Sequence, residues 1–390
     1  MILTQCAVCA TELGLSLGKK CGRCNTRYCG PECQMQHWKE GGHDKLCKKI
    51  KKAGGAEQYN ADQRYAKAVA VAAEKCAEDT KGQTCYICTQ ALHWKTKEGL
   101  VRGCSCRGTA GFAHVSCLAE EAKILVAEGL EDNLDPKAKE MRWGRWHTCS
   151  LCEQSYHGVV QCALGWASWK TYLGRPETEP ARIAAMTELG IGLFEAGRHE
   201  DALVVQKADL ATLLRIGASE SSILDVQSNL SNTYELLGRH ESALHMKRDV
   251  YSGRLKLNGE EHPQTLIVAN NYANSLCNLQ RHAEAKTLLR KTIPVARRNF
   301  GDSSDLTLQL RANYAAALYM DDGATLDDIR EAVSTLEEIE RIARRVFGGR
   351  HPTAVRMVRS LQKARAVLST REGDVEPLRE AVAAMTPGDA

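Results

Sequence analysis

The sequence predicts a mainly α-helical protein in which two small cysteine-rich modules precede a stack of helix pairs. Three observations support this prediction. Sixteen of the 17 cysteines lie before residue 163, and most of them form pairs separated by one to three residues. In the second half, the segments "GRHEDAL", "GRHESAL" and "QRHAEAK" recur at intervals of 41 and 42 residues, which is typical of stacked helical repeats. At 390 residues, the chain is also longer than one hydrophobic core usually organises, so two or three folded units are expected.

Composition helps to decide whether the cysteine pairs bind metal or form disulfides. No stretch reaches the roughly 18 consecutive apolar residues that span a bilayer, and the start, "MILTQCAVCATELG", lacks the basic and apolar regions of a signal peptide. We therefore expect a cytoplasmic protein without a membrane anchor. Thiols stay reduced in that compartment, and clustered cysteines there serve more often as metal ligands than as disulfide partners.

The first module, expected at residues 1–50, contains four short chelating pairs. They are Cys6 with Cys9, Cys21 with Cys24, Cys29 with Cys33, and His43 with Cys47. Two such pairs complete one tetrahedral zinc site, so eight ligands predict two zinc ions. The segments "CAVC", "CGRC", "YCGPECQMQHW" and "GHDKLC" resemble the MYND zinc finger.

The MYND resemblance implies that the pairs interleave, with one zinc held by Cys6, Cys9, Cys29 and Cys33 and the other by Cys21, Cys24, His43 and Cys47. His37 is interpreted as a packing residue. MYND fingers mostly bind short proline-containing peptides, although some only support a neighbouring domain, and the sequence leaves both uses open. The five lysines between Lys45 and Lys52 are interpreted as a solvated face, with nuclear import as the alternative. A helical linker is expected at residues 51–82.

The second module, expected at residues 83–160, again contains four chelating pairs. They are Cys85 with Cys88, Cys104 with Cys106, His114 with Cys117, and Cys149 with Cys152. The segment "VRGCSCRGTAGFAHVSC" resembles the RING-CH (RING-variant) finger, and a PHD finger is the alternative. The resemblance implies a cross-braced arrangement, in which one zinc is held by Cys85, Cys88, His114 and Cys117 and the other by Cys104, Cys106, Cys149 and Cys152. Protein side chains fill every ligand position, so all four zinc ions of the chain are expected to be structural and not catalytic.

The RING-CH resemblance also raises the question of ubiquitin transfer. RING-type domains usually act as ubiquitin ligases by docking a ubiquitin-conjugating enzyme in an apolar groove, without a catalytic side chain of their own. Ile87 fits the apolar position of the first zinc loop, but Glu121 stands where the family often has tryptophan. Trp143 or Trp146 is a candidate to replace that tryptophan, and packing against the zinc core is the favoured alternative.

The second half resembles the kinesin-light-chain variety of tetratricopeptide repeat, through "GEEHPQTLIVANNYANSLCNLQRHAEAKTLLRKTI". After a connector at residues 161–180, an α-solenoid is expected at 181–372, followed by a tail at 373–390. The four repeats are expected at 181–218, 222–258, 264–300 and 305–348, with a capping helix from about 352 to 370. The concave face of such solenoids commonly binds peptides, and its polar candidates here are Asn232, Arg239, Asn274 and Arg281.

The predicted function is a zinc-binding adaptor that mediates protein–protein interactions through its MYND, RING-CH and tetratricopeptide modules. The alternative is a ubiquitin ligase in which the repeats and the MYND finger recruit the substrate, so the sequence leaves open whether the chain is an enzyme. No nucleic-acid partner is expected. The formal charge of +4 falls to about −2 once fourteen thiolates and four zinc ions are counted, and no aromatic residues alternate with basic ones as single-strand binding requires.

Overall fold

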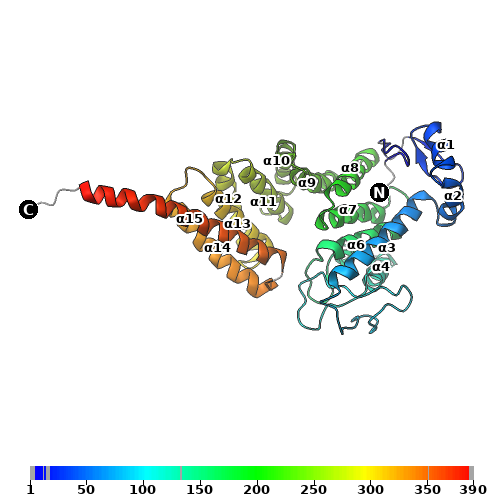
Figure 1. The fold of residues 1–390 in the computed structure, drawn as a ribbon, viewed down its shortest axis with the longest axis horizontal. Coiled ribbons are helices and arrows are strands. Elements are labelled where there is room, and N and C mark those ends of the chain that lie inside the picture. The colour runs from blue at the N-terminus through cyan, green and yellow to red at the C-terminus, as the bar shows by residue number, and fades with distance from the viewer. Residues whose placement is uncertain (1–4, 12, 15–17, 132–133, 350, 386–390) are drawn as a thin grey trace, which may run out of the picture. The chain divides into compact units, whose positions relative to one another are not determined.

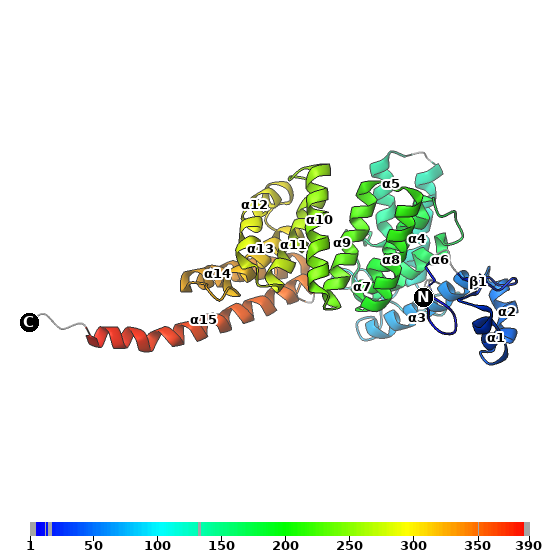
Figure 2. The same ribbon diagram turned by 90° about the horizontal axis from the view of Figure 1, so that it is seen from above.

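The computed structural model describes residues 5–11, 13–14, 18–131, 134–349 and 351–385, and the chain divides into two compact units, Met1–Leu237 and Gly238–Ala390. Fifteen α-helices make up most of this described part (Figures 1 and 2). The predicted mainly α-helical fold with N-terminal zinc modules and a C-terminal solenoid is confirmed. Within the described residues, no helix combines the length and the apolar character needed to cross a bilayer.

The N-terminal module of the first unit is small and contains little regular structure. Its elements are β1 (Lys19–Lys20), β2 (Arg27–Tyr28), α1 (Pro31–Lys39) and α2 (His43–Lys52). The two strands pair antiparallel, with Lys19 opposite Tyr28. Four of the eight buried residues in its core are cysteines, and Leu13, Tyr28 and Ile50 are its larger apolar members. Because so small an apolar core stabilises a fold only weakly, the module depends on its metal sites.

The rest of the first unit consists of helices around an irregular segment. These helices are α3 (Ala56–Cys76), α4 (Val115–Glu131), α5 (Pro136–Trp143), the 3-10 helix η1 (Gly144–Trp146), α6 (Gly158–Tyr172), α7 (Pro180–Glu195), α8 (His199–Ile216) and α9 (Glu220–Leu236). Residues 77–114 contain no helix, and a single bridge between Val101 and Ala113 is their only strand-like pairing. This segment carries the first five ligands of the second module. The sixth ligand, Cys117, lies on α4.

Helix α6 joins the second zinc module to the first helix pair of the solenoid. It is buried on nearly all sides and packs against α3, α4 and α7 (Figures 1 and 2). The backbones of α6 and α7 lie in contact where the two helices cross. A Cβ atom added at Gly192 would lie 2.7 Å from the Gln161 carbonyl oxygen, and one added at Gly165 would lie 2.8 Å from the Glu188 carbonyl oxygen. One hydrophobic core runs from Ala61 to Ala208. The zinc module and the helices α6–α8 therefore share one folded body.

The second unit is a succession of antiparallel helices. They are α10 (His240–Asn258), α11 (Pro263–Asn278), α12 (His282–Phe300), α13 (Asp305–Tyr319), α14 (Leu326–Phe347) and α15 (Pro352–Met385). Pro263 and Pro352 open their helices, where the missing N–H has no intrahelical partner to lose. Thr325 and Asp328 cap α14 reciprocally at its first turn.

Helix α15 differs from the expectation for the end of the chain. It begins where the capping helix is expected, but it continues to Met385, well beyond the expected end near residue 370. Glutamate and alanine are the commonest residues of the added turns and favour the helical state, whereas Gly373 and Pro377 oppose it.

Candidate metal centres

The sixteen predicted ligand side chains come together in four groups of four. The groups are Cys6, Cys9, Cys29 and Cys33; Cys21, Cys24, His43 and Cys47; Cys85, Cys88, His114 and Cys117; and Cys104, Cys106, Cys149 and Cys152. Within each group the ligand atoms all lie within 4.8 Å of one another. These are the same four groups that the MYND and RING-CH resemblances imply.

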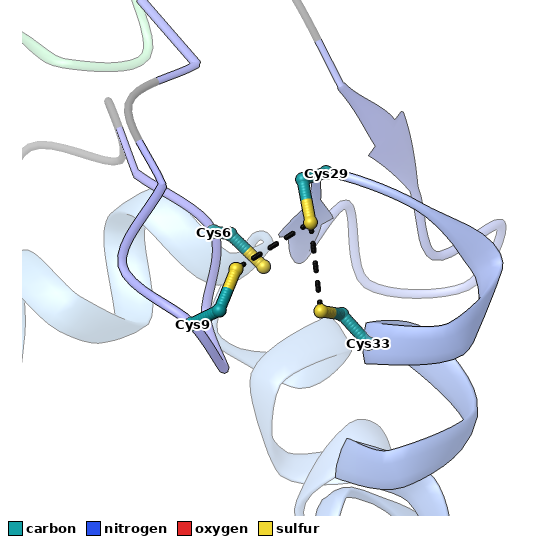
Figure 3. Close-up of side chains that lie close together, drawn as sticks. All are labelled: Cys6, Cys9, Cys29 and Cys33. Atoms are coloured by element: carbon teal, nitrogen blue, oxygen red, sulfur yellow. Dashed lines mark hydrogen bonds between the residues drawn. The ribbon is translucent and has the colours of Figure 1, made fainter.

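Figure 3 shows the first group, whose members come from three segments. Cys6 and Cys9 lie on the N-terminal turn, Cys29 follows β2, and Cys33 lies in the first turn of α1. The Cys29 sulfur is 3.5 Å from the sulfur of Cys9 and 3.5 Å from that of Cys33. A tetrahedral zinc with arms of about 2.3 Å places its sulfur ligands about 3.8 Å apart, whereas a disulfide would bring them to about 2.05 Å. The spacing therefore fits a zinc site and excludes disulfides.

The second group is fully buried and uses a helix to present two of its ligands. Helix α2 begins at His43, so His43 and Cys47 stand one turn apart on the same face. The Cys21 and Cys47 sulfurs are 3.9 Å apart, and the Cys24 sulfur is 3.5 Å from His43 Nε2. His37 lies outside the group, where its Nδ1 is 3.0 Å from the Tyr28 hydroxyl and its ring is 4.8 Å from the His43 ring.

In the third group a second contact orients the histidine. His114 Nδ1 lies 3.4 Å from the Cys88 sulfur and 3.7 Å from that of Cys117, while its Nε2 lies 3.4 Å from the Ala91 carbonyl oxygen. A backbone carbonyl on the far nitrogen is the usual way in which proteins fix the tautomer and direction of a zinc-binding imidazole. His114 is fully buried, so its ring has little freedom to turn away.

The fourth group closes across a long stretch of sequence and depends on a glycine. The Cys106 and Cys149 sulfurs are 3.8 Å apart. Gly111 has φ +83°, and a Cβ atom there would lie 2.5 Å from Cys106 Cβ and 2.9 Å from its sulfur. Any larger residue would strain the backbone and push the Cys106 ligand aside.

The electrostatics of the groups favour a bound cation. The Thr11 hydroxyl, 3.0 Å from the Cys9 sulfur, lowers the pKa of that thiol to about 6, whereas the Cys29 thiol beside Cys33 raises the pKa of Cys33 to about 12. In the fourth group, hydrogen bonding with Cys104 lowers the pKa of Cys149 to about 4. Within a group, some thiols therefore lose their proton easily and others keep it. The reason is that several negatively charged thiolates repel one another at this distance unless a positive charge lies between them. A divalent cation supplies that charge.

Three segments of the chain match known families. Residues 6–47 match the MYND finger, residues 85–125 the RING-variant domain, and residues 223–264 and 265–305 the tetratricopeptide repeat. The chain carries a MYND finger, a RING-variant domain and tetratricopeptide repeats, in that order. The pair formed by Cys149 and Cys152 lies beyond the matched RING-variant segment, so its place in the fourth group rests on geometry.

The chain is similar to several solved structures, whereas none of the curated proteins matches it. The putative kinesin light chain nearly identical TPR-like repeats of Podosopora anserina are 21% identical, with a TM-score of 0.40, over 54% of this chain and 100% of that one. BtubC (BKLC) from P. vanneervenii is 17% identical, with a TM-score of 0.43, over 59% of this chain and 94% of that one.

The MYND finger and the RING-variant domain bind zinc, and the four groups correspond to four zinc ions per chain. All eight positions of each domain are occupied by cysteine or histidine, so no coordination site is left for a substrate. The tetratricopeptide repeats imply protein partners. Together these domains indicate a zinc-binding protein-interaction adaptor.

The structure places the remaining candidate residues in different environments. Ile87 is 40% exposed, whereas Trp146 is completely buried, so its indole packs in the core and offers no surface to a partner. Asn232 on α9 and Asn274 on α11 are half-buried. Arg281 is exposed and forms an ion pair with Glu284 at the start of α12. Arg239 occupies the corresponding turn before α10 and is exposed.

Sequence reasoning did not single out Leu151 of the RING-variant domain. Leu151 is 50% exposed and holds the third position of the turn Cys149–Cys152, just as Ile87 does in the turn Cys85–Cys88. This equivalence of position in two Cys-x2-Cys turns is the signal that could have found it.

Proposed function

We propose that the chain is a zinc-dependent protein-interaction adaptor and that its RING-variant domain binds a partner through the two Cys-x2-Cys turns. The supporting observation is the exposure of Ile87 and Leu151, one on each turn. Zinc coordination at both ends of each turn fixes the backbone, so these apolar side chains are held out towards solvent. We call the surface formed by Ile87, Leu151, Tyr86, Glu121 and Ser150 the knuckle surface.

A polar contact ties the two turns together in the middle of the knuckle surface. The Tyr86 hydroxyl lies 3.0 Å from the Ser150 hydroxyl and donates to a Glu121 carboxylate oxygen at 3.4 Å. Glu121 comes from α4, so three segments meet at this point. A partner here meets two apolar side chains with a carboxylate beside them, and burying that carboxylate requires a cationic group on the partner.

The MYND finger offers a second apolar surface for the adaptor. Met35 and Trp38 on α1 are 55% and 44% exposed, and the Trp38 ring contacts the His43 ring at 5.7 Å between centroids. Because His43 belongs to the second zinc group, loss of that zinc would also disturb Trp38. This coupling makes peptide binding by α1 dependent on metal.

Ubiquitin-ligase activity is the second candidate function, and the exposed Ile87 in the first zinc loop favours it. In that case the partner at the knuckle surface is a ubiquitin-conjugating enzyme. Glu121 then pairs with a basic residue of that enzyme, in place of the apolar contact that a tryptophan makes.

One variant set tests both functions. The double variant Ile87→Ala and Leu151→Ala removes the apolar part of the knuckle surface, and Met141→Ala is the matched control because Met141 is 66% exposed on α5 of the same domain. We expect the double variant to keep four zinc ions and to lose a subset of partners in quantitative capture experiments, which Met141→Ala retains.

Ubiquitin-chain formation with a panel of purified conjugating enzymes separates the two functions. Chains formed by the wild type and not by the double variant would establish the ligase. Absence of chains with all enzymes, together with variant-sensitive partner capture, would establish the adaptor alone. Identical partner sets for the wild type and the double variant would refute the knuckle surface.

A further inference from the structure

A groove of about 830 Å³ lies in the first unit, and none of the five residues of the knuckle surface lines it. The loop 89–99 of the RING-variant domain, α3, α4 and α6 form its walls. We define the lysine groove by its lining residues Tyr65, Trp94, Lys95, Lys123, Lys170 and Thr171. None of these residues belongs to a zinc group.

The loop that carries Trp94 and Lys95 is held firmly on both sides. The Glu98 carboxylate accepts hydrogen bonds from the Ser116 backbone N–H at 2.7 Å and from the Ser116 hydroxyl at 2.9 Å, which fastens the loop to the first turn of α4. His93 is only 8% exposed, and its ring contacts the His114 ring at 5.3 Å. The Lys97 backbone N–H donates to the His93 carbonyl oxygen at 2.9 Å.

This ordered loop nevertheless exposes a large apolar ring. Trp94 is 69% exposed, more than any other large hydrophobic side chain in the described residues. A flexible loop could bury its indole, but the contacts of His93 and Glu98 prevent this. Because the backbone of this loop is already held in place, a partner that covers the indole orders little additional backbone, which favours Trp94 as an anchor.

Among the residues that line the lysine groove, positive charges outnumber negative ones. Its lining includes three lysines and one acidic residue, Glu120. Lys95 has no ion-pair partner among the described residues. Lys123 pairs with Glu120 at 3.2 Å, and both side chains are more than half exposed. Such exposed pairs contribute about 0–1 kcal/mol, so a carboxylate of a partner can readily replace them.

The third lysine is positioned by an aromatic ring. Lys170 Nζ lies 4.1 Å from the centre of the Tyr65 ring and 3.8 Å from Asp62 Oδ1. The cation covers one face of Tyr65, which leaves Trp94 as the ring of this groove that is free to stack on a ligand. Binding of single-stranded nucleic acid uses several successive stacking rings. One exposed indole among three lysines fits a peptide better.

We propose that the lysine groove binds an acidic peptide segment of a partner protein. An apolar or aromatic side chain of the peptide rests on Trp94, and its carboxylates contact Lys95, Lys123 and Lys170. The inference rests on the proposed function, because it assigns the adaptor a second protein-binding surface and states the chemistry of that partner.

The test uses the purified full chain with zinc and a fluorescein-labelled peptide rich in glutamate and aspartate with one central phenylalanine. We expect saturable binding by fluorescence anisotropy that weakens as salt rises. The variant Lys95→Glu with Lys123→Glu should weaken binding by about tenfold or more, which corresponds to about 1.4 kcal/mol. Trp94→Ala should also weaken it, and Lys95→Arg with Lys123→Arg should bind like the wild type.

The matched control reverses two lysines elsewhere on the same unit. Lys75 on α3 and Lys137 on α5 are exposed and do not line the groove, so Lys75→Glu with Lys137→Glu makes the same change in net charge. Equal loss of affinity in this control would overturn the proposal. So would equal binding of a lysine-rich peptide, tighter binding of an oligothymidine, or no binding of the acidic peptide at all.

Zinc content and circular dichroism identify any variant that fails to fold. If the glutamate variant fails to fold, the variant Lys95→Arg with Lys123→Arg still tests the proposal, because it keeps both positive charges. The outcome is independent of the knuckle surface. The variant with Ile87→Ala and Leu151→Ala should bind the acidic peptide normally, so failure of the groove and failure of the proposed function give different results.

Discussion

Replacing Gly192 by alanine should force α6 and α7 apart. The added Cβ would lie 2.7 Å from the Gln161 carbonyl oxygen and 2.9 Å from Cys162 Cα. Both are backbone atoms of α6, so neither can move unless the whole helix moves. Alanine improves helix propensity by up to about 1 kcal/mol, but overpacking in a filled core costs about 1–3 kcal/mol. We expect a net loss of about 1–2 kcal/mol in the unfolding free energy of the first unit.

Gly190→Ala provides the matched control on the same helix. Its Cβ would meet Gln206 Cγ at 3.1 Å, a side-chain atom that can shift, so the gain in propensity should offset the contact. All six tryptophans lie in the first unit, so tryptophan fluorescence in a urea titration reports on that unit alone. The reasoning is refuted if Gly192→Ala is as stable as the wild type or more stable.

Three further predictions follow from the zinc groups and from one buried carboxyl. Elemental analysis should find four zinc ions per chain, and Cys149→Ser should lower the count by about one. Gly111→Ala should also lose zinc from the fourth group. Gly108→Ala should keep this zinc, because Gly108 has φ +60° but open space around the position of its Cβ. Equal zinc contents in the two variants would contradict the steric argument. Burial raises the pKa of Asp209 to about 7 from its ordinary 3.8, although a Thr187 hydroxyl donates to it at 2.7 Å. The folded state therefore holds this proton more tightly than the unfolded state, and stability falls as pH rises from about 4 through about 7, by up to about 1.4 kcal/mol per pH unit. Urea titrations between about pH 6 and 7, where zinc stays bound, should show a steeper fall in the wild type than in Asp209→Asn, in which His147 with its raised pKa still contributes.

The chelating pairs could be predicted from the sequence because they are local. Cys85 and Cys88, or His43 and Cys47, are so close along the chain that any tight turn or helical turn brings them together. The helical repeats could be predicted for a similar reason, since Pro263 opens a helix and Gly259 or Gly301 ends one through short-range backbone preferences.

The surfaces could not be predicted in the same way. Trp146 was a candidate for partner contact, and only its surroundings show that it is buried between Trp143 and Tyr172, with ring centroids at 6.4 and 5.9 Å. Leu151 and Trp94 are exposed because of how distant segments pack around them. Exposure depends on every neighbour of a side chain, and a linear pattern records few of those neighbours.

By itself the sequence determined the kinds of domain and the residues able to bind zinc, because ligand chemistry and short spacings are properties of the chain. Tertiary structure alone decided that Tyr86 joins Ser150 to Glu121 and that the zinc module shares a core with α6–α8. Such contacts join residues tens of positions apart, and their formation depends on how whole helices pack. The partner surfaces proposed for this protein are consequences of that packing.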